Sequence, residues 1–419
     1  MVHSWYMDKP HLTPRFSTRR DFLKTSAAGA ALLTTHPLFS SGASGANERI
    51  AIGCIGTGER GSALMDEIMA LAENQNVHIT AVCDVWRKNR QAAATRVNTK
   101  LGTEPRQFTR FTELLALKDV DAVTIATPDF SHGTILTAAL KAGKDVYVEK
   151  PMTIDLASAN EALALARTNR RVVQVGTQRR SEGQFIGAAK YLASGILGRI
   201  SRVSAAMYFH EARWARNFSD CQEADVDWEA FLLNLPQRPF DAKLLRRWQL
   251  YRETSNGLPG LWMTHYADAI HLLMGAQYPS SAVAHGGIYV WKDGRDHTDT
   301  FHALLDYPEG FLFDWGMGLG NSSGVHFTIH GTLGTMDLEK WTVSAEGGRN
   351  SPIQSGPVPR EPNQSHMGNW LECLRSRQRP NADIQFGHQH AVATIMAAVA
   401  LQTGRRQHYD PVQKTISPG

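Results

Sequence analysis

The spacing of apolar positions divides the chain beyond residue 46 into two parts. From Asn47 to about Gln178, short apolar runs alternate with stretches of helical period. Strands are expected at Ile50–Ile55, Val77–Cys83, Val120–Ala126, Asp145–Val148 and Val172–Val175, and helices from Ser62 and over Thr134–Ala142 and Leu156–Asn169. Repeated strand–helix units predict an α/β domain over residues 47–178, with a parallel sheet and ligands at the carboxyl ends of its strands.

Beyond Arg179 the pattern changes to strand-like runs separated by Gly, Asp or Pro. Strands are expected at Ile200–Phe209, Ala282–Trp291, Thr300–Tyr307, Phe311–Trp315 and Val325–His330, and helices at Phe185–Leu192 and Thr264–Met274. This predicts an α+β domain over residues 179–345 with a large, mainly antiparallel open sheet. We expect a homo-oligomer formed through that sheet. Residues 346–419 are expected to form a loop and two helices, His366–Arg375 and Gln389–Thr403, packed back on the first domain.

The first 46 residues carry an export signal rather than a domain. Thr18-Arg19-Arg20-Asp21-Phe22-Leu23-Lys24 precedes a short, mild apolar run and the small residues Ser44-Gly45-Ala46. This order is typical of a twin-arginine signal peptide, with residues 34–46 as linker and cleavage region. The apolar run is too short for a comfortable membrane span, so stable membrane insertion is not expected. The predicted location is periplasmic or secreted.

Composition narrows the possible partners. The chain has 419 residues, 42% of them hydrophobic and 20% charged, which suits a two-domain globular protein. Its net charge is +4, but five Lys and Arg and two Asp lie in the first 46 residues. The remainder is close to neutral, so nucleic acid is not an expected partner. The four cysteines lack CxxC spacing, and His388-Gln389-His390 is interpreted as a helix cap or surface feature, so no metal site is predicted.

A glycine-rich turn is the strongest chemical signal. Gly56-Thr57-Gly58-Glu59-Arg60-Gly61 follows the first strand and opens a helix, and Asp84 ends the second strand. The glycines allow a tight turn, close approach to a diphosphate and helix packing, while the acid accepts from a ribose hydroxyl. These features predict a Rossmann domain that binds NAD. Arg87 and Lys88 follow closely, so NADP remains possible.

Three polar clusters follow further strands of the same sheet. They are Thr127-Pro128-Asp129-Phe130-Ser131-His132, Glu149-Lys150-Pro151 and Gln178-Arg179-Arg180. Because parallel strands bring their carboxyl ends to one crevice, these clusters are expected to meet there. Thr127, Pro128, His132, Glu149, Lys150 and Gln178 therefore join the six residues of the glycine turn and Asp84 as candidate cofactor-binding residues.

Residues 47–419 resemble the Gfo/Idh/MocA family of sugar and polyol oxidoreductases in these motifs, of which Glu149-Lys150-Pro151 is the most specific. The resemblance implies that Lys150 lies beside the nicotinamide and that Glu149 and Thr127 help hold the cofactor. It further implies a catalytic histidine, matched by His265 in the second domain. Most dehydrogenases of the family carry an aspartate four residues earlier, where this chain has Leu261. Asp268 either compensates or is a helix-surface acid.

The chemistry needs a general base, because hydride loss from a secondary alcohol requires the hydroxyl proton to leave as well. Lys150, His265 and Asp268 are the candidate catalytic residues. An exported enzyme meets no free pool of NAD(H), so we expect a tightly bound cofactor that is regenerated during turnover. The predicted function is oxidation of a secondary hydroxyl of a sugar, polyol or glycoside. An NAD-dependent glycoside hydrolase, acting by transient oxidation and elimination, and a non-catalytic sugar-binding protein remain alternatives. Trp262 and the aromatic residues of 287–294 are either a sugar-binding lining or ordinary core.

Overall fold

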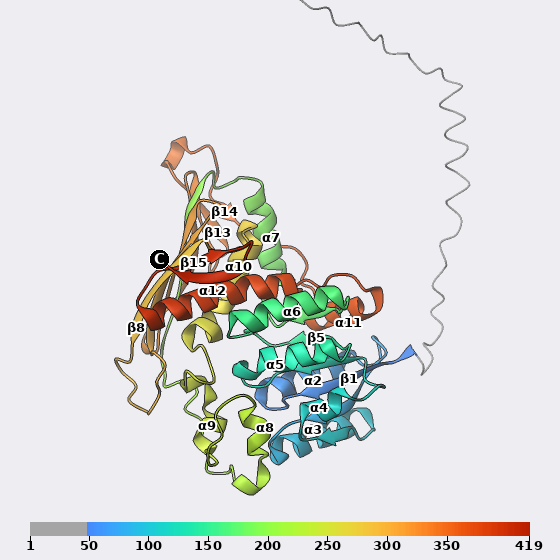
Figure 1. Cartoon of the computed structure of the whole chain (residues 1–419). Helices are drawn as coiled ribbons and strands as arrows, with labels where there is room; N and C mark the ends of the chain where they lie inside the picture. Colours follow the sequence, from blue (N-terminus) through green and yellow to red (C-terminus); the bar gives the residue numbers. More distant parts are fainter. Residues whose placement is uncertain (1–47) are drawn as a thin grey trace, which may run out of the picture. The chain divides into compact units, whose positions relative to one another are not determined.

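The computed structural model describes residues 48–419, apart from the side chain of Arg349, and the predicted signal peptide lies outside this part. Residues 50–175 form a parallel sheet of six strands in the order β3-β2-β1-β4-β5-β6 (Figure 1). The strands are β1 Ile50–Ile55, β2 Val77–Cys83, β3 Arg106–Phe108, β4 Ala122–Ile125, β5 Asp145–Val148 and β6 Val173–Val175. The strand order reverses between β1 and β4, so their carboxyl ends open the crevice that binds ligands in such sheets.

Helices cover both faces of this sheet. They are α2 Glu59–Leu71, α3 Arg87–Leu101, α4 Phe111–Leu115, α5 Asp129–Lys141 and α6 Leu156–Thr168. α2 and α3 bury apolar side chains such as Leu64 and Val97 against one face, and α4, α5 and α6 cover the other. β4 and β5 are buried along their whole length, which explains their nearly continuous apolar sequences.

The second sheet has ten strands in the order β14-β13-β12-β11-β7-β10-β9-β8-β15-β16. β7 and β10 run parallel, and the other neighbouring pairs are antiparallel. The strands are β7 Ile200–His210, β8 Ser281–Gly287, β9 Thr300–Tyr307, β10 Phe311–Gly318, β11 Gly320–Gly331, β12 Gly334–Asp337, β13 Thr342–Ala345, β14 Gly356–Pro357, β15 Gln407–Asp410 and β16 Thr415–Pro418. The predicted fold class, a Rossmann domain plus an α+β domain with a large open sheet, is confirmed.

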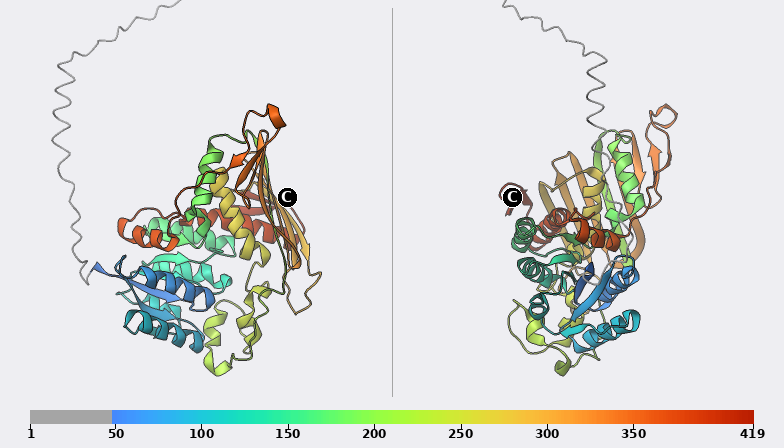
Figure 2. Two further views of the ribbon diagram at one scale, coloured as in Figure 1. Left: turned by 180° about the vertical axis from the view of Figure 1, so that it is seen from behind. Right: turned by 90° about the vertical axis from the view of Figure 1, so that its right-hand side faces the viewer.

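One face of the second sheet is covered by α7 Gly183–Ala193, α10 Thr264–Met274 and α12 Ile384–Thr403 (Figure 2). β9 alternates strictly, with Phe301, Ala303 and Leu305 buried and His302, Leu304 and Asp306 exposed. The sheet face that carries His302, Leu304 and Asp306 is therefore exposed along β9 in the single chain. Whether copies of the chain pair through this face stays a prediction.

The last helix joins the two sheets. α11 His366–Ser376 packs against α2, as expected for a terminal helix returning to the first domain. α12 contacts α6 and β6 on one side and α10 and β8 on the other, so it belongs to both cores. His388 and His390 are fully buried within it. Their interpretation as a cap or surface feature is wrong, because α12 begins at Ile384 and is covered on nearly every side.

Residues 211–257 form an excursion between β7 and α10 that the apolar pattern did not predict. It contains two five-residue helices, α8 Trp228–Leu232 and α9 Ala242–Arg246, and lies beside the Rossmann domain (Figure 1). β8 also ends at Gly287 rather than at Trp291. The buried Asp299 carboxylate accepts from the backbone N–H groups of Tyr289, Val290 and Trp291, which favours a turn there over a sheet ladder.

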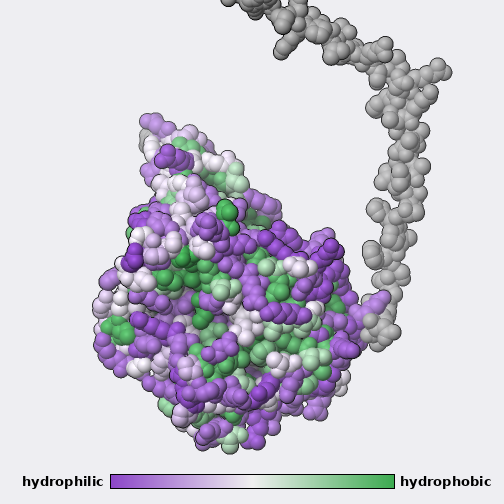
Figure 3. Space-filling model, in the orientation of Figure 1, coloured by the Kyte–Doolittle hydropathy of each residue, from purple (hydrophilic) through white to green (hydrophobic). Residues whose placement is uncertain are grey.

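On the face seen in Figure 3, apolar side chains lie in patches between hydrophilic ones. Within residues 48–419, no helix is both long enough and apolar enough to cross a bilayer.

Candidate active site

The backbone of the glycine turn leaves no room for a side chain at Gly56 or Gly61. Gly56 has a φ of +79°, and a Cβ there would lie 2.7 Å from the Ala126 carbonyl. A Cβ at Gly61 would lie 1.9 Å from the Gly56 oxygen. Gly58 begins α2 without a side-chain cap, so the first N–H groups of that helix lack a capping side chain. The turn therefore fits the diphosphate of a dinucleotide.

Asp84 is fixed at the other end of this turn. Its Oδ2 accepts from the Thr57 N–H at 2.9 Å, and its Oδ1 accepts from the Trp86 N–H at 2.9 Å. Asn89 lies 3.4 Å from Oδ2. Burial raises the pKa of Asp84, while these hydrogen bonds oppose the rise. Asp84 thus follows the end of β2, where an acid binds ribose hydroxyls in dinucleotide-binding folds, and that role for Asp84 stays a prediction.

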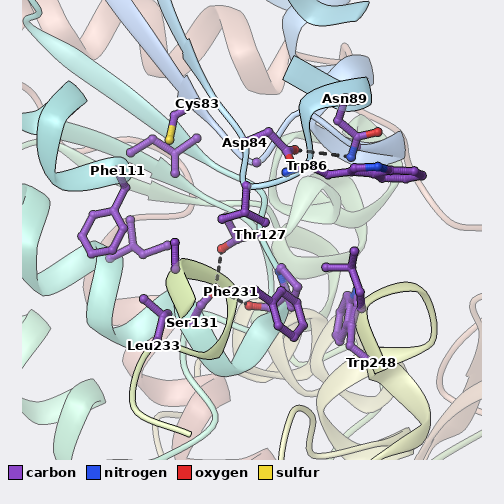
Figure 4. Close-up of a pocket in the computed structure, with 18 of the residues that line it drawn as sticks. Cys83, Asp84, Trp86, Asn89, Phe111, Thr127, Ser131, Phe231, Leu233 and Trp248 are labelled. Carbon is purple, nitrogen blue, oxygen red and sulfur yellow. Dashed lines mark hydrogen bonds between the residues drawn. The ribbon is translucent and has the colours of Figure 1, made fainter. Parts of the chain in front are cut away.

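A cleft of about 480 Å³ opens at the carboxyl ends of β1, β2 and β4 (Figure 4). Asp84 and Trp86 lie on one side, Thr127 lies near its middle, and Phe231 and Trp248 face them from the excursion. The excursion thus supplies one wall of the cleft, including two aromatic faces. No apolar period along residues 211–257 marks this wall in the sequence.

Ion pairs fasten the excursion to the Rossmann domain across the cleft. Arg216 binds Glu59 in the glycine turn at 3.0 Å, and Arg110 binds Glu229 at 2.7 Å. Further pairs join Arg87 to Asp225 and, at 2.5 Å, Lys88 to Asp220. Both cations that follow Asp84 are therefore engaged by carboxylates of the excursion.

The predicted cofactor residues fall into two groups. Those lining the cleft are Gly56, Gly58, Glu59, Arg60, Asp84, Thr127 and Pro128. Those behind or beyond it are Thr57, Gly61, His132, Glu149, Lys150 and Gln178. His132 is buried, with ring nitrogens 2.8 Å from the Thr127 and Pro151 carbonyls, so it ties two strand-end loops together. Gln178 donates to the Tyr147 hydroxyl at 3.3 Å.

Lys150 reaches across to the second domain. Its Nζ donates to the backbone oxygen of Leu261 at 2.6 Å. Leu261 lies in a π-helical turn, Pro259–Met263, which leads directly into α10. Burial lowers the pKa of Lys150, although Glu149 and Asp129 oppose the shift. Glu149 in turn accepts from Arg60 Nε of the glycine turn at 2.6 Å, which couples Lys150 to the cofactor cleft.

His265 lies one turn beyond Leu261, on α10. Its pKa is lowered well below the usual value, first by burial and then by the positive charges of Lys150 and Arg179. The charge of Lys150 from the first domain therefore acts on an imidazole of the second, and the pKa values of both groups are lowered. This pairing suits removal of a proton from an alcohol near neutral pH. Trp262 lies beside His265, with ring centroids 6.2 Å apart.

Asp268 is not a helix-surface acid, and that interpretation is wrong. It is fully buried, and both of its carboxylate oxygens accept from Arg180 Nε, at 2.8 and 2.9 Å. His390 Nδ1 lies 3.4 Å from Oδ1. Burial alone would raise the pKa of Asp268, but Arg180 and His390 outweigh it and hold the pKa below its usual value. The geometry favours support of α10 over proton transfer, and a catalytic role for Asp268 stays a prediction.

Arg179 is a site residue whose role the sequence did not reveal. Its guanidinium lies 4.2 Å from the Tyr266 ring centre, and its charge acts on His265. The polar cluster Gln178-Arg179-Arg180 marked this strand end in the sequence, but the two arginines could not be told apart there. Arg180 is buried in its ion pair, whereas Arg179 stacks on aromatic rings.

The glycine turn, Asp84 and the cleft define a dinucleotide-binding oxidoreductase. A family model for an oxidoreductase family with an NAD-binding Rossmann fold matches residues 50–177, and its C-terminal alpha/beta domain model matches residues 191–406. The chain belongs to the Gfo/Idh/MocA oxidoreductase family. A twin-arginine translocation signal model matches residues 17–36, which indicates export by that route.

Curated relatives are distant. The chain is 29% identical over 225 residues to the uncharacterized oxidoreductase YdgJ of Escherichia coli, covering 52% of this chain and 53% of the relative. It is 30% identical over 158 residues to the inositol 2-dehydrogenase of Salmonella typhimurium, covering 37% and 45%. The chain thus spans about half the length of the curated relatives it matches.

Solved structures share the fold over most of the chain. The WlbA dehydrogenase of Bordetella pertussis, solved with NADH and UDP-GlcNAcA, has a TM-score of 0.65 at 20% identity, covering 86% of this chain and 99% of that one. The aldose-aldose oxidoreductase of Caulobacter crescentus, complexed with glycerol, has a TM-score of 0.64 at 17% identity, covering 86% and 99%. At these identities the likeness concerns the fold.

Proposed function

We propose that this protein oxidises a secondary hydroxyl of a sugar, polyol or glycoside with a tightly bound NAD. One observation carries the proposal: Lys150 donates to the Leu261 carbonyl in the turn that leads into α10, its charge acts on His265, and burial lowers the pKa values of both groups. When bound, the nicotinamide supplies the chemistry of hydride acceptance and return. Lys150 takes the hydroxyl proton, and His265 accepts a hydrogen bond from the substrate and orients it.

The charges around Asp84 favour NAD over NADP. A 2′-phosphate would face the Asp84 carboxylate, and a nearby cation would be needed to accommodate it. The two candidates, Arg87 and Lys88, are already paired with Asp225 and Asp220. Opening those pairs would add to the cost of binding a phosphate.

Two observations support a cofactor that stays bound. The excursion forms one wall of the cleft and is held by ion pairs at both ends of the dinucleotide site, at Glu59 and beside Asp84. Export also removes the protein from the cellular pool of NAD(H). A redox-neutral cycle follows, either exchange between two sugars or glycoside cleavage by oxidation, elimination and re-reduction. The levoglucosan dehydrogenase structure, solved with NADH and levoglucosan, has the same fold and supports a carbohydrate substrate.

The first experiment asks whether a sugar reduces the bound cofactor. Protein purified without added dinucleotide is mixed with single sugars, polyols and aryl glycosides, and the absorbance band of reduced nicotinamide is followed. We expect one of these compounds to produce the band in proportion to the bound cofactor. Acid release and mass spectrometry should identify that cofactor as NAD. If none of the compounds alters the band and no aglycone is released, the sugar-binding alternative becomes the better account, and NADP(H) as the sole dinucleotide would refute the NAD assignment.

A further inference from the structure

Position 261 supplies no carboxylate to Lys150. The Leu261 side chain is buried and apolar, and Lys150 Nζ instead donates to the Leu261 backbone oxygen. Asp268, the acid on α10, is committed to Arg180. A base that takes a proton from an alcohol must pass it on before the next cycle. The structure therefore raises the question of which acid serves Lys150.

A second carboxylate lies in the same corner, on the Rossmann side. Asp129 is the first residue of α5, follows β4 and is 1% exposed. β4 and β5 are parallel neighbours, so the segments that carry Asp129 and Lys150 leave adjacent strand ends. A Cβ built at Gly260 would lie 3.7 Å from Asp129 Oδ2 and 3.6 Å from Pro151 Cγ. The Asp129 carboxylate, the residue after Lys150 and the residue before Leu261 thus converge on one point.

The two oxygens of Asp129 differ in their surroundings. The Ser255 hydroxyl donates to Oδ2 at 3.0 Å. The oxygen of the same hydroxyl accepts from the Gly257 N–H at 2.9 Å, which holds the serine side chain in this position. Oδ1 is buried and no described side chain donates to it, while backbone N–H groups at the start of α5 help to stabilise the carboxylate. Oδ1 is thus the oxygen that no side chain engages. It is the oxygen that can receive a proton during turnover.

We propose that Asp129 is the acid that serves Lys150 in this chain, holding the proton that Lys150 takes from the substrate hydroxyl. Lys150 Nζ gains that proton and becomes an ammonium. The proton then moves to Asp129, which becomes a neutral carboxylic acid, and Lys150 returns to its amine. Re-reduction of the substrate runs the same transfers backwards. Asp129 is a positioning residue, because it acts through Lys150 and not on the substrate.

The electrostatic surroundings agree with this role. Burial raises the pKa of Asp129 to about 7, while Ser255 and Lys150 oppose the shift, so the group gains and loses a proton near neutral pH. The charged groups that act on Lys150 are Glu149, Asp129 and Arg60. Glu149 forms an ion pair with Arg60 at 2.6 Å. Of the two carboxylates that act on Lys150, Asp129 is therefore the one without such a close ion pair.

The role of Asp129 rests on the proposed function of Lys150 as the base. Its test therefore uses no sugar and measures the charge state of Lys150 directly. The full chain, as purified, is acetylated competitively with acetic anhydride over a pH series, and labelling of Lys150 is read by mass spectrometry. Asp129→Asn keeps an oxygen for the Ser255 hydroxyl but removes the charge. Loss of the Asp129 charge should lower the pKa of Lys150. A fall of about one unit raises the fraction of free amine, and therefore the labelling of Lys150 at neutral pH, about tenfold.

Ser255→Ala is the complementary control, because it removes the hydrogen bond that Asp129→Asn keeps and leaves the Asp129 carboxylate in place. Ser255 holds the pKa of Asp129 down, so the two variants are compared at a pH well above 7, where Asp129 stays ionised and labelling of Lys150 in Ser255→Ala should change little. Equal effects in both variants, or no effect of Asp129→Asn, would overturn the proposal. If Asp129→Asn fails to fold, the wild-type labelling curve decides: an inflection near pH 7, in addition to that of Lys150 itself, supports the proposal, and a single inflection refutes it. Because no substrate is used, failure here leaves the sugar-oxidation experiment unaffected.

Discussion

Replacement of Lys150 by Met is expected to lower the turnover by a factor of about 10²–10⁴, the usual contribution of a positioned general acid–base group. The methylene stem is retained, so the protein should fold and keep its cofactor. What is lost is the amine that reaches the Leu261 carbonyl and takes the substrate proton. Turnover is measured with whichever sugar reduces the bound nicotinamide, together with cofactor content after gel filtration.

Lys144 offers a matched control at the opposite end of the same strand. It precedes β5, and its Nζ donates to the Leu117 and Val120 carbonyls at 2.5 and 2.7 Å. Lys144→Met therefore removes the same kind of contact far from the cleft, and should affect stability more than turnover. Near-wild-type turnover of Lys150→Met, or an equal loss in both variants, would exclude Lys150 as the base.

Asp268→Asn is expected to lower the free energy of unfolding by about 3–5 kcal/mol, the usual cost of breaking a buried ion pair from one side. Arg180 would remain as a buried cation, since its side chain is 3% exposed and faces Asp268. The contribution also depends on pH. Because the folded-state pKa of Asp268 is lowered, its stabilisation is present above the unfolded pKa of aspartate and is lost as the pH falls through the folded value. Urea denaturation at neutral and acidic pH measures both effects.

Two further variants separate charge from packing. Glu253→Gln breaks the largely exposed pair with Arg238 and should change the free energy of unfolding by less than about 1 kcal/mol. Replacing Asp268 by Leu together with Arg180 by Met removes both charges and should restore most of the loss, as apolar replacements of buried pairs often do. An Asp268→Asn variant as stable as the wild type would show that the pair does not support α10.

The Rossmann half was predictable because its signals are local. The glycine turn, the short apolar strands and Asp84 lie in consecutive sequence, and each obeys a rule of backbone geometry or burial. β1, β2 and β5 begin and end at the predicted residues, and so do β9 and α10 of the second domain. Lys150 and His265 came from the family resemblance. Their approach through the Leu261 carbonyl is a contact between domains that spacing along the chain cannot show.

The excursion and the buried polar groups were not predictable for physical reasons. α8 and α9 are single turns that Asp227 and Asp241 cap, too short to show a helical apolar period. Asp268 and His390 are polar residues in apolar surroundings. The two partners of Asp268, Arg180 and His390, lie 88 and 122 residues away from it in the sequence. Polarity predicts exposure for each residue taken alone, whereas burial here depends on the pairing.

If the proposed function is right, the protein turns over on the nicotinamide that it carries. The most direct test counts product molecules per bound nicotinamide, with no dinucleotide added, for aryl glycosides and for pairs of sugars offered as donor and acceptor. We expect many products per bound cofactor, either released aglycone or paired oxidised and reduced sugars. At most one product per bound cofactor, with sustained turnover only when soluble NAD is supplied, would contradict it.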